Sequence, residues 1–328
     1  MSSEHFLVTG ALGCIGAWTV KRLVGEGTPV WTYDLPGNPH RLRLIMDDAA
    51  LSKVNFISGD ITDFESFERA VVENKITHIV HLAALQVPFV RADPIQGARV
   101  NVVGNAVVLE TVKRHKNQVQ GLAYASSIGV YGPDEMYPDA PLANDAPPHP
   151  TTLYGVYKQA DEGMARIYWQ DYGVPSIGLR PCVIYGPGRD QGMTSTPTKG
   201  MLAAAIGRPY HISYGGTIIM QYADDMANVF LRAARADGSG APVFNPSGTS
   251  ASMPEIIAAI DAAAPEMKGK ITFEPTSLHL PPEVDESALR ERIGKVEWIP
   301  LTTGVRQTID LFRRAAKQGL IDADRILA

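Results

Sequence analysis

The sequence predicts an α/β fold, a doubly wound parallel sheet with a smaller second domain, because short β-rich runs alternate with longer helical patterns through the first half of the chain. A segment with glycine at every third position, Thr9–Gly16, separates the first β-rich run from the first helical pattern. After Tyr185 the alternation gives way to loop-forming glycine, proline and threonine residues. We therefore expect a Rossmann core with an added region.

The core is expected to contain six strands joined by crossover helices. The β-rich segments are His5–Gly10, Pro29–Leu35, Val54–Asp60, His78–Ala84, Gly121–Ser127 and Ser176–Tyr185. The segments with apolar residues at helical spacing are Gly16–Gly25, Phe64–Asn74, Ile95–His115 and Thr151–Tyr172. The proline-rich stretch Pro138–Pro150 is expected to be a surface loop that leads into the last of these helices.

The second half is expected to contribute to both domains. A helix at Asp224–Arg235 and an apolar strand at Pro242–Asn245 should return to the main sheet. The other segments with a regular pattern are Met201–Ile206, Pro254–Ala264, Lys270–Glu274 and Thr303–Gln318. The sequence thus predicts a Rossmann domain of residues 1–180 plus about 221–248. A discontinuous substrate-binding region would comprise about 181–220 plus 249–328.

The composition argues against several classes of partner. A net charge of −5 with scattered lysine and arginine offers no surface for nucleic acid or for an anionic membrane. The two cysteines, Cys14 and Cys182, lack metal-ligand neighbours at a useful spacing, so we expect a reduced, cytoplasmic environment and no metal. We find no signal-peptide pattern and no run of ~18 apolar residues, so we expect a soluble protein.

The glycine segment predicts a dinucleotide site. Gly10, Gly13 and Gly16 follow an apolar run and open a helix, where backbone amides can reach a pyrophosphate; Cys14 and Ile15 belong to the same loop. The spacing differs from the usual Gly-x-Gly-x-x-Gly pattern. A plain strand–helix turn is the alternative interpretation.

Asp34 ends the second predicted strand, where a carboxylate can accept hydrogen bonds from the adenosine ribose hydroxyls. It would also repel a 2′-phosphate, so NAD is favoured over NADP. Arg41 and Arg43 keep NADP as a minor alternative, and Asp34 could instead cap a turn.

The ends of the next two strands are expected to border the same ligand. Asp60 and Ile61 close the third strand, and Leu82, Ala83 and Ala84 close the fourth. Small residues there would let a cofactor approach closely, although simple packing would also use them.

Tyr154 and Lys158 lie one helical turn apart, so the lysine ammonium can stabilise the phenolate and lower the phenol's pKa from ~10 towards working pH. Such a tyrosine is a general base for a hydroxyl. Tyr157 is expected to point away from this face and to pack. The spacing alone can arise by chance, so it needs the surrounding motifs.

Taken together, the motifs resemble the extended short-chain dehydrogenase/reductase family, which contains NAD-dependent nucleotide-sugar epimerases, dehydratases and related dehydrogenases. The resemblance covers nearly the whole chain. The matching pieces are Thr9–Gly16, Asp34, Gly59-Asp60, His81–Ala84, Asn101, Ser126–Gly132, Tyr154–Lys158 and Arg180–Gly188.

The resemblance implies a role for each member of a catalytic trio. Ser127 would hydrogen-bond the reacting oxygen, Tyr154 would be the acid/base, and Lys158 would hold the nicotinamide ribose and favour the phenolate. Asn101 would lie near the cofactor, with bonding to backbone or water as the alternative, and Pro181 and Val183 would run past the nicotinamide. The resemblance also implies that Tyr154 and Lys158 contact the cofactor.

The resemblance also implies a homodimer formed through the helices Ile95–His115 and Thr151–Tyr172. Val103, Val107 and Val108 offer apolar surface for such pairing. Packing in the core is an equally good use of these valines.

Departures from the family pattern narrow the reaction. Ile128-Gly129 replaces the Asp-Glu of the dehydratases, so elimination is not expected. Val183 and Ile218 replace the Asn and Arg that usually bind a nucleotide-sugar diphosphate, and each lost charge-assisted hydrogen bond is worth roughly 1.5–3 kcal/mol. Arg189, Thr194 and Ser195 could instead bind a smaller anionic or polyhydroxylated molecule, with ordinary solvation as the alternative.

The resulting hypothesis is an NAD-dependent oxidoreductase that acts at a hydroxyl or carbonyl carbon of a small sugar-like or hydroxy-acid substrate. An NAD-dependent nucleotide-sugar epimerase is the main alternative. A non-catalytic dinucleotide-binding protein is a minor one, because Ser127, Tyr154 and Lys158 are all present.

Overall fold

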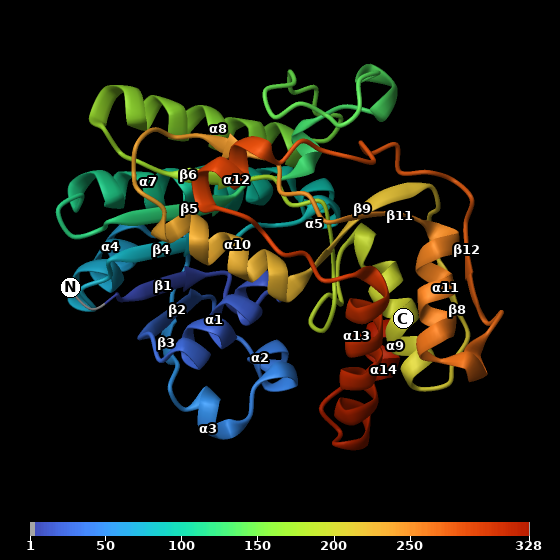
Figure 1. The fold of residues 1–328 in the computed structure, drawn as a ribbon. Helices are drawn as coiled ribbons and strands as arrows, with labels where there is room; N and C mark the ends of the chain where they lie inside the picture. The colour runs from blue at the N-terminus through green and yellow to red at the C-terminus, as the bar shows by residue number, and fades with distance from the viewer. Residues whose placement is uncertain (1–3, 328) are drawn as a thin grey trace.

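A seven-stranded parallel sheet forms the centre of the protein in the computed structural model, which describes residues 4–327 (Figure 1). The strand order is β10-β6-β5-β4-β1-β2-β3, and every neighbouring pair runs parallel. The strands are β1 Phe6–Thr9, β2 Val30–Asp34, β3 Asn55–Ser58, β4 His78–His81, β5 Gly121–Ala125, β6 Ile177–Leu179 and β10 Val243–Phe244. The predicted α/β doubly wound sheet is confirmed, and the segment at Pro242–Asn245 joins it as the edge strand β10.

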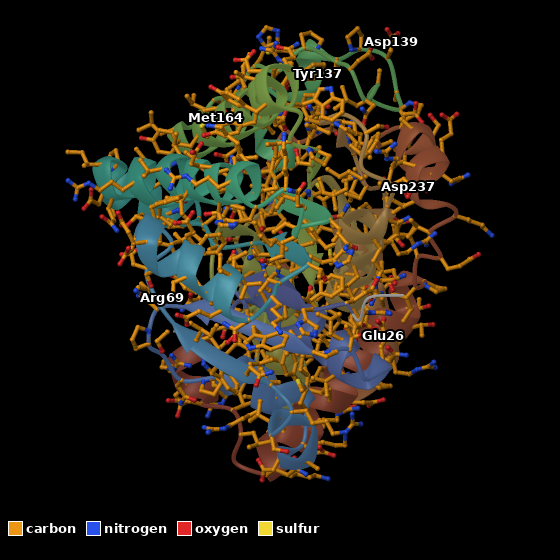
Figure 2. All side chains as sticks on the ribbon, turned by 90° about the vertical axis from the view of Figure 1, so that its left-hand side faces the viewer. Glu26, Arg69, Tyr137, Asp139, Met164 and Asp237 are labelled. Atoms are coloured by element: carbon orange, nitrogen blue, oxygen red, sulfur yellow. The ribbon has the colours of Figure 1, made fainter. Side chains whose placement is uncertain are left out.

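Helices cover both faces of this sheet. The side chains of a strand alternate between faces, so Leu7 packs into one apolar cluster while Phe6 and Val8 pack into another. The first cluster lies under α4 Phe64–Glu73, α7 Gly104–Arg114 and α8 Leu153–Tyr172; the second lies under α1 Cys14–Glu26 and α10 Ala223–Arg235. In Figure 2, Arg69 of α4 and Met164 of α8 accordingly lie on one side, and Glu26 of α1 and Asp237 lie on the other.

Shorter helices fill two connections of the sheet. Helices α2 His40–Ile45 and α3 Asp48–Leu51 follow β2. Helices α5 Val87–Ala92 and α6 Pro94–Ala98 follow β4. A π-helical segment, Arg99–Val103, joins α6 to α7. The sequence pattern predicted one continuous helix at Ile95–His115, and the π segment interrupts it.

The smaller lobe lies beyond the carboxyl ends of the strands, on the right of Figure 1. It contains a mixed sheet in the order β11-β9-β7 and a parallel pair β12-β8. Its strands are β7 Val183–Tyr185, β8 Tyr210–Ile212, β9 Thr217–Tyr222, β11 Thr249–Ser252 and β12 Ile271–Phe273. Its helices are α9 Thr196–Ala205, α11 Met253–Ala263, α13 Leu301–Lys317 and α14 Ala323–Leu327; α12 Ser287–Ile293 instead packs beside α10.

The predicted strand Ser176–Tyr185 is wrong as a single element. It splits into β6 in the main sheet and β7 in the mixed sheet, with Arg180-Pro181-Cys182 between them. Pro181 has no amide hydrogen to donate, so a strand ladder breaks there. The chain therefore leaves the main sheet at this point and enters the smaller lobe.

The described surface bears on the expected dimer contact and on membrane insertion. Val107 and Val108 pack in the core, whereas Val103 is exposed. Val103 is therefore the one valine of the three that offers apolar surface. None of the helices within residues 4–327 has the length and apolar character needed to cross a membrane. The domain boundaries proposed from the sequence stay a prediction.

Candidate active site

A cleft of about 800 Å³ opens where the strands of the main sheet end and the smaller lobe begins. It is bordered by the loops that follow β1, β2, β3, β4 and β5, by the N-terminal end of α8, and by the smaller lobe. Most of the residues predicted for the site line it: Gly10, Gly13, Cys14, Ile15, Gly16, Asp34, Asp60, Ile61, Leu82, Ala83, Ala84, Ser127, Tyr154, Lys158, Pro181, Val183, Arg189 and Thr194. Asn101 and Ser195 do not.

The glycine loop turns from β1 into the N-terminus of α1. Gly10 has φ +66°, and a Cβ there would lie 2.7 Å from the Ala83 amide nitrogen; a Cβ on Gly16 would lie 2.2 Å from the Gly10 carbonyl oxygen. Gly13 is the N-cap of α1, with no capping side chain and no acidic residue in the first turn. The uncapped amides at this helix end face the cleft and fit the pyrophosphate of a dinucleotide.

Asp34 lies beside this loop at the end of β2. Its Oδ2 accepts a hydrogen bond from the Leu12 amide at 3.2 Å, and burial raises the pKa of Asp34 to about 7. Arg41 donates to the Leu12 carbonyl at 2.7 Å and to Asp190 Oδ1 at 2.6 Å, and Arg43 lies outside the cleft. Because Arg41 is already engaged, the arrangement fits a ribose diol better than a 2′-phosphate.

Asn101 supports the cleft from behind. Its side-chain oxygen accepts from the Leu85 amide at 2.7 Å, and its amide nitrogen donates to the Leu85 carbonyl at 2.9 Å. Asn101 lies in the π segment, which turns this side chain inward. Its direct partner is therefore the loop after β4, and that loop carries Leu82, Ala83 and Ala84 into the cleft.

Ser127 and Tyr154 both lie beside Gly129. A Cβ on Gly129 would lie 3.3 Å from Ser127 Oγ and 3.8 Å from the Tyr154 ring. A Cβ on Gly155 would lie 2.1 Å from the Gly129 carbonyl oxygen, so α8 begins in direct contact with the loop that carries Ser127. Gly129 and Gly155 thus bring the hydroxyl and the phenol together, a role that the sequence pattern did not reveal.

Lys158 is buried one turn below Tyr154. Its Nζ donates to Asp161 Oδ2 at 3.1 Å. Burial alone would lower the pKa of Lys158, but the attraction of Asp161, Tyr154 and Glu162 outweighs it and raises the pKa above its usual value. The lysine is therefore an ammonium at neutral pH. Tyr157 points away from the cleft, as predicted, and donates to the Pro94 carbonyl at 3.1 Å.

An ion-pair network fixes α8 against the strand ends. Both Glu162 oxygens accept from Arg180, each at 2.8 Å, and Glu162 Oε1 also accepts from Ser126 Oγ at 2.5 Å. Arg180 in turn donates to Tyr131 Oη at 2.5 Å and to the Asn144 carbonyl at 3.0 Å. In the sequence, Ser126 and Arg180 stand out only as parts of motifs, and no pattern marks the largely buried Glu162 as their partner.

The smaller lobe presents polar groups to the same cleft. Arg189 donates to Thr194 Oγ1 at 2.8 Å and to Gln86 Oε1 at 3.4 Å, while its Nε is buried with no hydrogen-bond partner. Within residues 4–327 it forms no ion pair. Ser195 is buried, and its hydroxyl donates to the Gly192 carbonyl at 2.7 Å, which shapes the loop.

The two thiols near the cleft are not poised for reaction. Burial raises the pKa of both Cys14 and Cys182 to about 12, so neither is a thiolate at neutral pH. In the part of the chain that the structure describes, Asp134, Glu135 and His279 are the one group that could gather a metal ion. They are largely exposed and pair with one another at the edge of the cleft.

Comparison with known proteins gives consistent results over most of the chain. A sequence model of the NAD dependent epimerase/dehydratase family matches residues 6–245. The UDP-glucose 4-epimerase of Mycolicibacterium smegmatis is 30% identical over 322 residues, which cover 95% of this chain and 99% of that protein.

Solved structures with the same fold are also found. The Thermus thermophilus UDP-glucose 4-epimerase in complex with NAD superposes with a TM-score of 0.77 at 26% identity, covering 95% of this chain and 99% of that one. An L-threonine dehydrogenase from Clostridium difficile superposes with a TM-score of 0.81 at 21% identity, covering 98% and 100%, and shares the fold.

The Glu162–Arg180 pair is expected to stabilise the protein strongly. Glu162→Gln should lower the free energy of unfolding by about 3 kcal/mol, because it leaves the buried Arg180 charge uncompensated. Urea denaturation measures the loss. Glu110→Gln, which breaks a more exposed pair with Lys113 and Arg114, is the control and should cost under about 1 kcal/mol. Equal losses in the two variants would contradict this assignment.

Proposed function

The chain belongs to the NAD dependent epimerase/dehydratase family, and from this membership we propose that it oxidises a secondary alcohol or hemiacetal carbon of a small, anionic sugar-like or hydroxy-acid substrate, reversibly. It is an NAD-dependent enzyme of the extended short-chain dehydrogenase/reductase type.

The observation that carries the proposal is the character of the substrate side of the cleft. Val183, which lines the cleft, and Ile218, which packs in the apolar core, are each 1% exposed. The two positions where nucleotide-sugar enzymes of this type usually place polar phosphate ligands are therefore buried and apolar. Arg189 is an unpaired cation in the same cleft, with a buried Nε that has no partner. A carboxylate or phosphate on a small substrate would satisfy it.

The residues present fit NAD. We propose that the α1 N-terminus holds the pyrophosphate, Asp34 the adenosine ribose, and Lys158 the nicotinamide ribose. Gly13 supports this, because it lines the cleft as the uncapped N-cap of α1, and a Cβ there would lie only 3.0 Å from the Gly10 carbonyl oxygen. When bound, NAD supplies the hydride acceptor.

Tyr154 would remove the hydroxyl proton as the C–H bond breaks, so that positive charge does not build up on the carbon. Ser127 would hold the reacting oxygen, since it lines the same cleft as Tyr154 and both lie beside Gly129. The Lys158 ammonium would stabilise the phenolate during the transfer. In the reverse direction Tyr154 returns the proton to the carbonyl oxygen.

An NAD-dependent nucleotide-sugar epimerase is the second candidate. It is favoured by the 30% identity with a UDP-glucose 4-epimerase across almost the whole chain. Incubation with nucleotide sugars separates the two, because an epimerase forms the epimer without net reduction of added NAD. The proposed dehydrogenase reduces NAD stoichiometrically.

We also propose a homodimer formed through the helices α6 and α8 and the π segment between α6 and α7. The support is exposed apolar surface on these adjacent elements: Ile95 is 71% exposed, Val103 46% and Val156 44%. Light scattering on the purified protein would read its mass directly.

Tyr154→Phe is expected to lower kcat by roughly 10²- to 10⁴-fold, because the proton acceptor is lost while the ring remains. Turnover should be measured on whichever substrate a panel of sugar acids, hydroxy acids and aldoses identifies with NAD. Tyr157→Phe removes a hydroxyl on the same helix that bonds Pro94, so it should leave kcat unchanged. Full activity in the Tyr154 variant would refute the catalytic assignment.

NAD affinity is expected to depend on pH through Asp34. Its pKa is about 7 in the free protein, and ribose hydroxyls that donate to it favour the ionised form. NAD should therefore bind more tightly as pH rises towards 7, by up to about tenfold per unit, and level off above. Calorimetric titration at several pH values measures this, and Asp34→Asn should bind more weakly with a flat profile. A flat wild-type profile would exclude the role of Asp34.

Arg189→Gln is expected to raise KM for an anionic substrate by about 10- to 100-fold, because a charge-assisted hydrogen bond is lost. A neutral analogue of the same substrate should be affected little. Arg43→Gln removes an arginine outside the cleft and serves as the control. If both substrates lost affinity equally, Arg189 would shape the cleft without recognising charge.

A further inference from the structure

A buried carboxylate stands directly behind Lys158 and is not used by the proposed chemistry. Asp161 lies three residues further along α8, and its side chain is 1% exposed while that of Lys158 is 4% exposed. Asp161 Oδ2 accepts from the lysine Nζ at 3.1 Å. Its other oxygen, Oδ1, is buried and has no hydrogen-bond partner among the residues described.

Fold stability does not explain this carboxylate. The neighbouring Glu162 is fully satisfied, because Arg180 bonds both of its oxygens and Ser126 bonds one. Asp161 has a single ammonium partner, and the desolvation of a buried ion pair with an unsatisfied oxygen can cost more than the attraction returns, so such a pair is weak evidence for stability. Its effect must therefore be sought on Lys158.

The surroundings leave Asp161 as the counter-charge of that lysine. On α8 itself Asp161 faces Lys158 and Glu162, and Lys158 in turn faces Tyr154. Glu162 is already paired with Arg180 beyond β6. From β5, Tyr124 lies nearby as a neutral phenol, because burial and the two acids raise its pKa well above the usual value.

From β4, His81 is neutral as well. Burial, with the nearby charge of Lys158, lowers the pKa of His81 to about 3, and its Nδ1 is hydrogen-bonded to Thr9 Oγ1 at 2.8 Å. Among these neighbours, Asp161 is the one anion not already matched by another cation. The strength of the positive field that Lys158 exerts on Tyr154 thus depends on the charge of Asp161.

We propose that Asp161 is a positioning residue that fixes the Lys158 ammonium and offsets its charge, and so sets the pH range in which Tyr154 exchanges its proton. The inference rests on the proposed function of Tyr154 as acid/base. An unopposed ammonium would hold the phenolate too firmly for Tyr154 to return a proton, whereas a paired one leaves Tyr154 able to act in both directions. The carboxyl group of Asp161 is itself a weaker acid than usual, since burial raises its pKa to about 6.

The first test needs no substrate. Phenolate absorbance is titrated in wild type minus Tyr154→Phe, and in Asp161→Asn minus the double variant Asp161→Asn/Tyr154→Phe, so that each difference reports Tyr154 alone. Phenolate should form at Tyr154 about one pH unit lower when Asp161 is neutral, because the field of Lys158 is no longer opposed.

The second test is the pH profile of kcat/KM. Its acid limb should move about one unit lower in Asp161→Asn, and Asp161→Glu, which keeps the charge, should move the limb back towards the wild-type position. Glu110→Gln breaks the exposed pair with Lys113 at the same 3.1 Å and three-residue spacing, and should leave the limb in place. A merely structural role would change stability without moving the limb.

Each outcome decides the question. A folded Asp161→Asn with an unshifted Tyr154 titration and acid limb would overturn the proposal. Asp161→Ala is the second variant if Asp161→Asn does not fold, and failure of both to fold would mean that Asp161 serves the fold, which also overturns it. If the Tyr154 shift is present but the wild type turns over no substrate with NAD, the proposed function fails while the control of Tyr154 by Asp161 stands.

Discussion

The docking of α8 on the ends of β5 and β6 is the constraint on which the site depends. Glu162 accepts two hydrogen bonds from Arg180 and one from Ser126, so a helix and two strand ends are joined by one buried carboxylate. Tyr154 and Lys158 lie on the same helix, about two turns and one turn, respectively, before this carboxylate. Their positions over the sheet are therefore set by an interaction that takes no part in the chemistry.

A second constraint is close backbone approach without side chains. A Cβ on Gly10 would collide with the loop after β4, and one on Gly16 would collide with Gly10 itself, so the α1 N-terminus lies directly over the end of β1. A Cβ on Gly155 would likewise collide with the Gly129 carbonyl oxygen, so α8 lies directly against the loop after β5. The cofactor end and the reacting end of the cleft thus use the same device, a glycine at each point where a helix begins beside a strand end.

The charges in the cleft divide by function. Arg41 is paired with Asp190, and Lys158 with Asp161, which leaves Arg189 as a cation with an unsatisfied buried nitrogen. The unsatisfied buried nitrogen of Arg189, together with the apolar Val183 in the same cleft, favours a small anion over a nucleotide sugar.

The sequence by itself determined the sheet, its crossover helices, the glycine loop and the Ser127, Tyr154 and Lys158 motifs, because strand–helix periodicity and short motifs are local patterns. Tertiary structure decided the break of the predicted strand at Pro181, the inward turn of Asn101 and the burial of Asp161. These depend on partners distant in sequence, such as the strand that β7 joins and the loop that Asn101 holds. Burial decides which charges remain unpaired, and no periodicity in the chain encodes it.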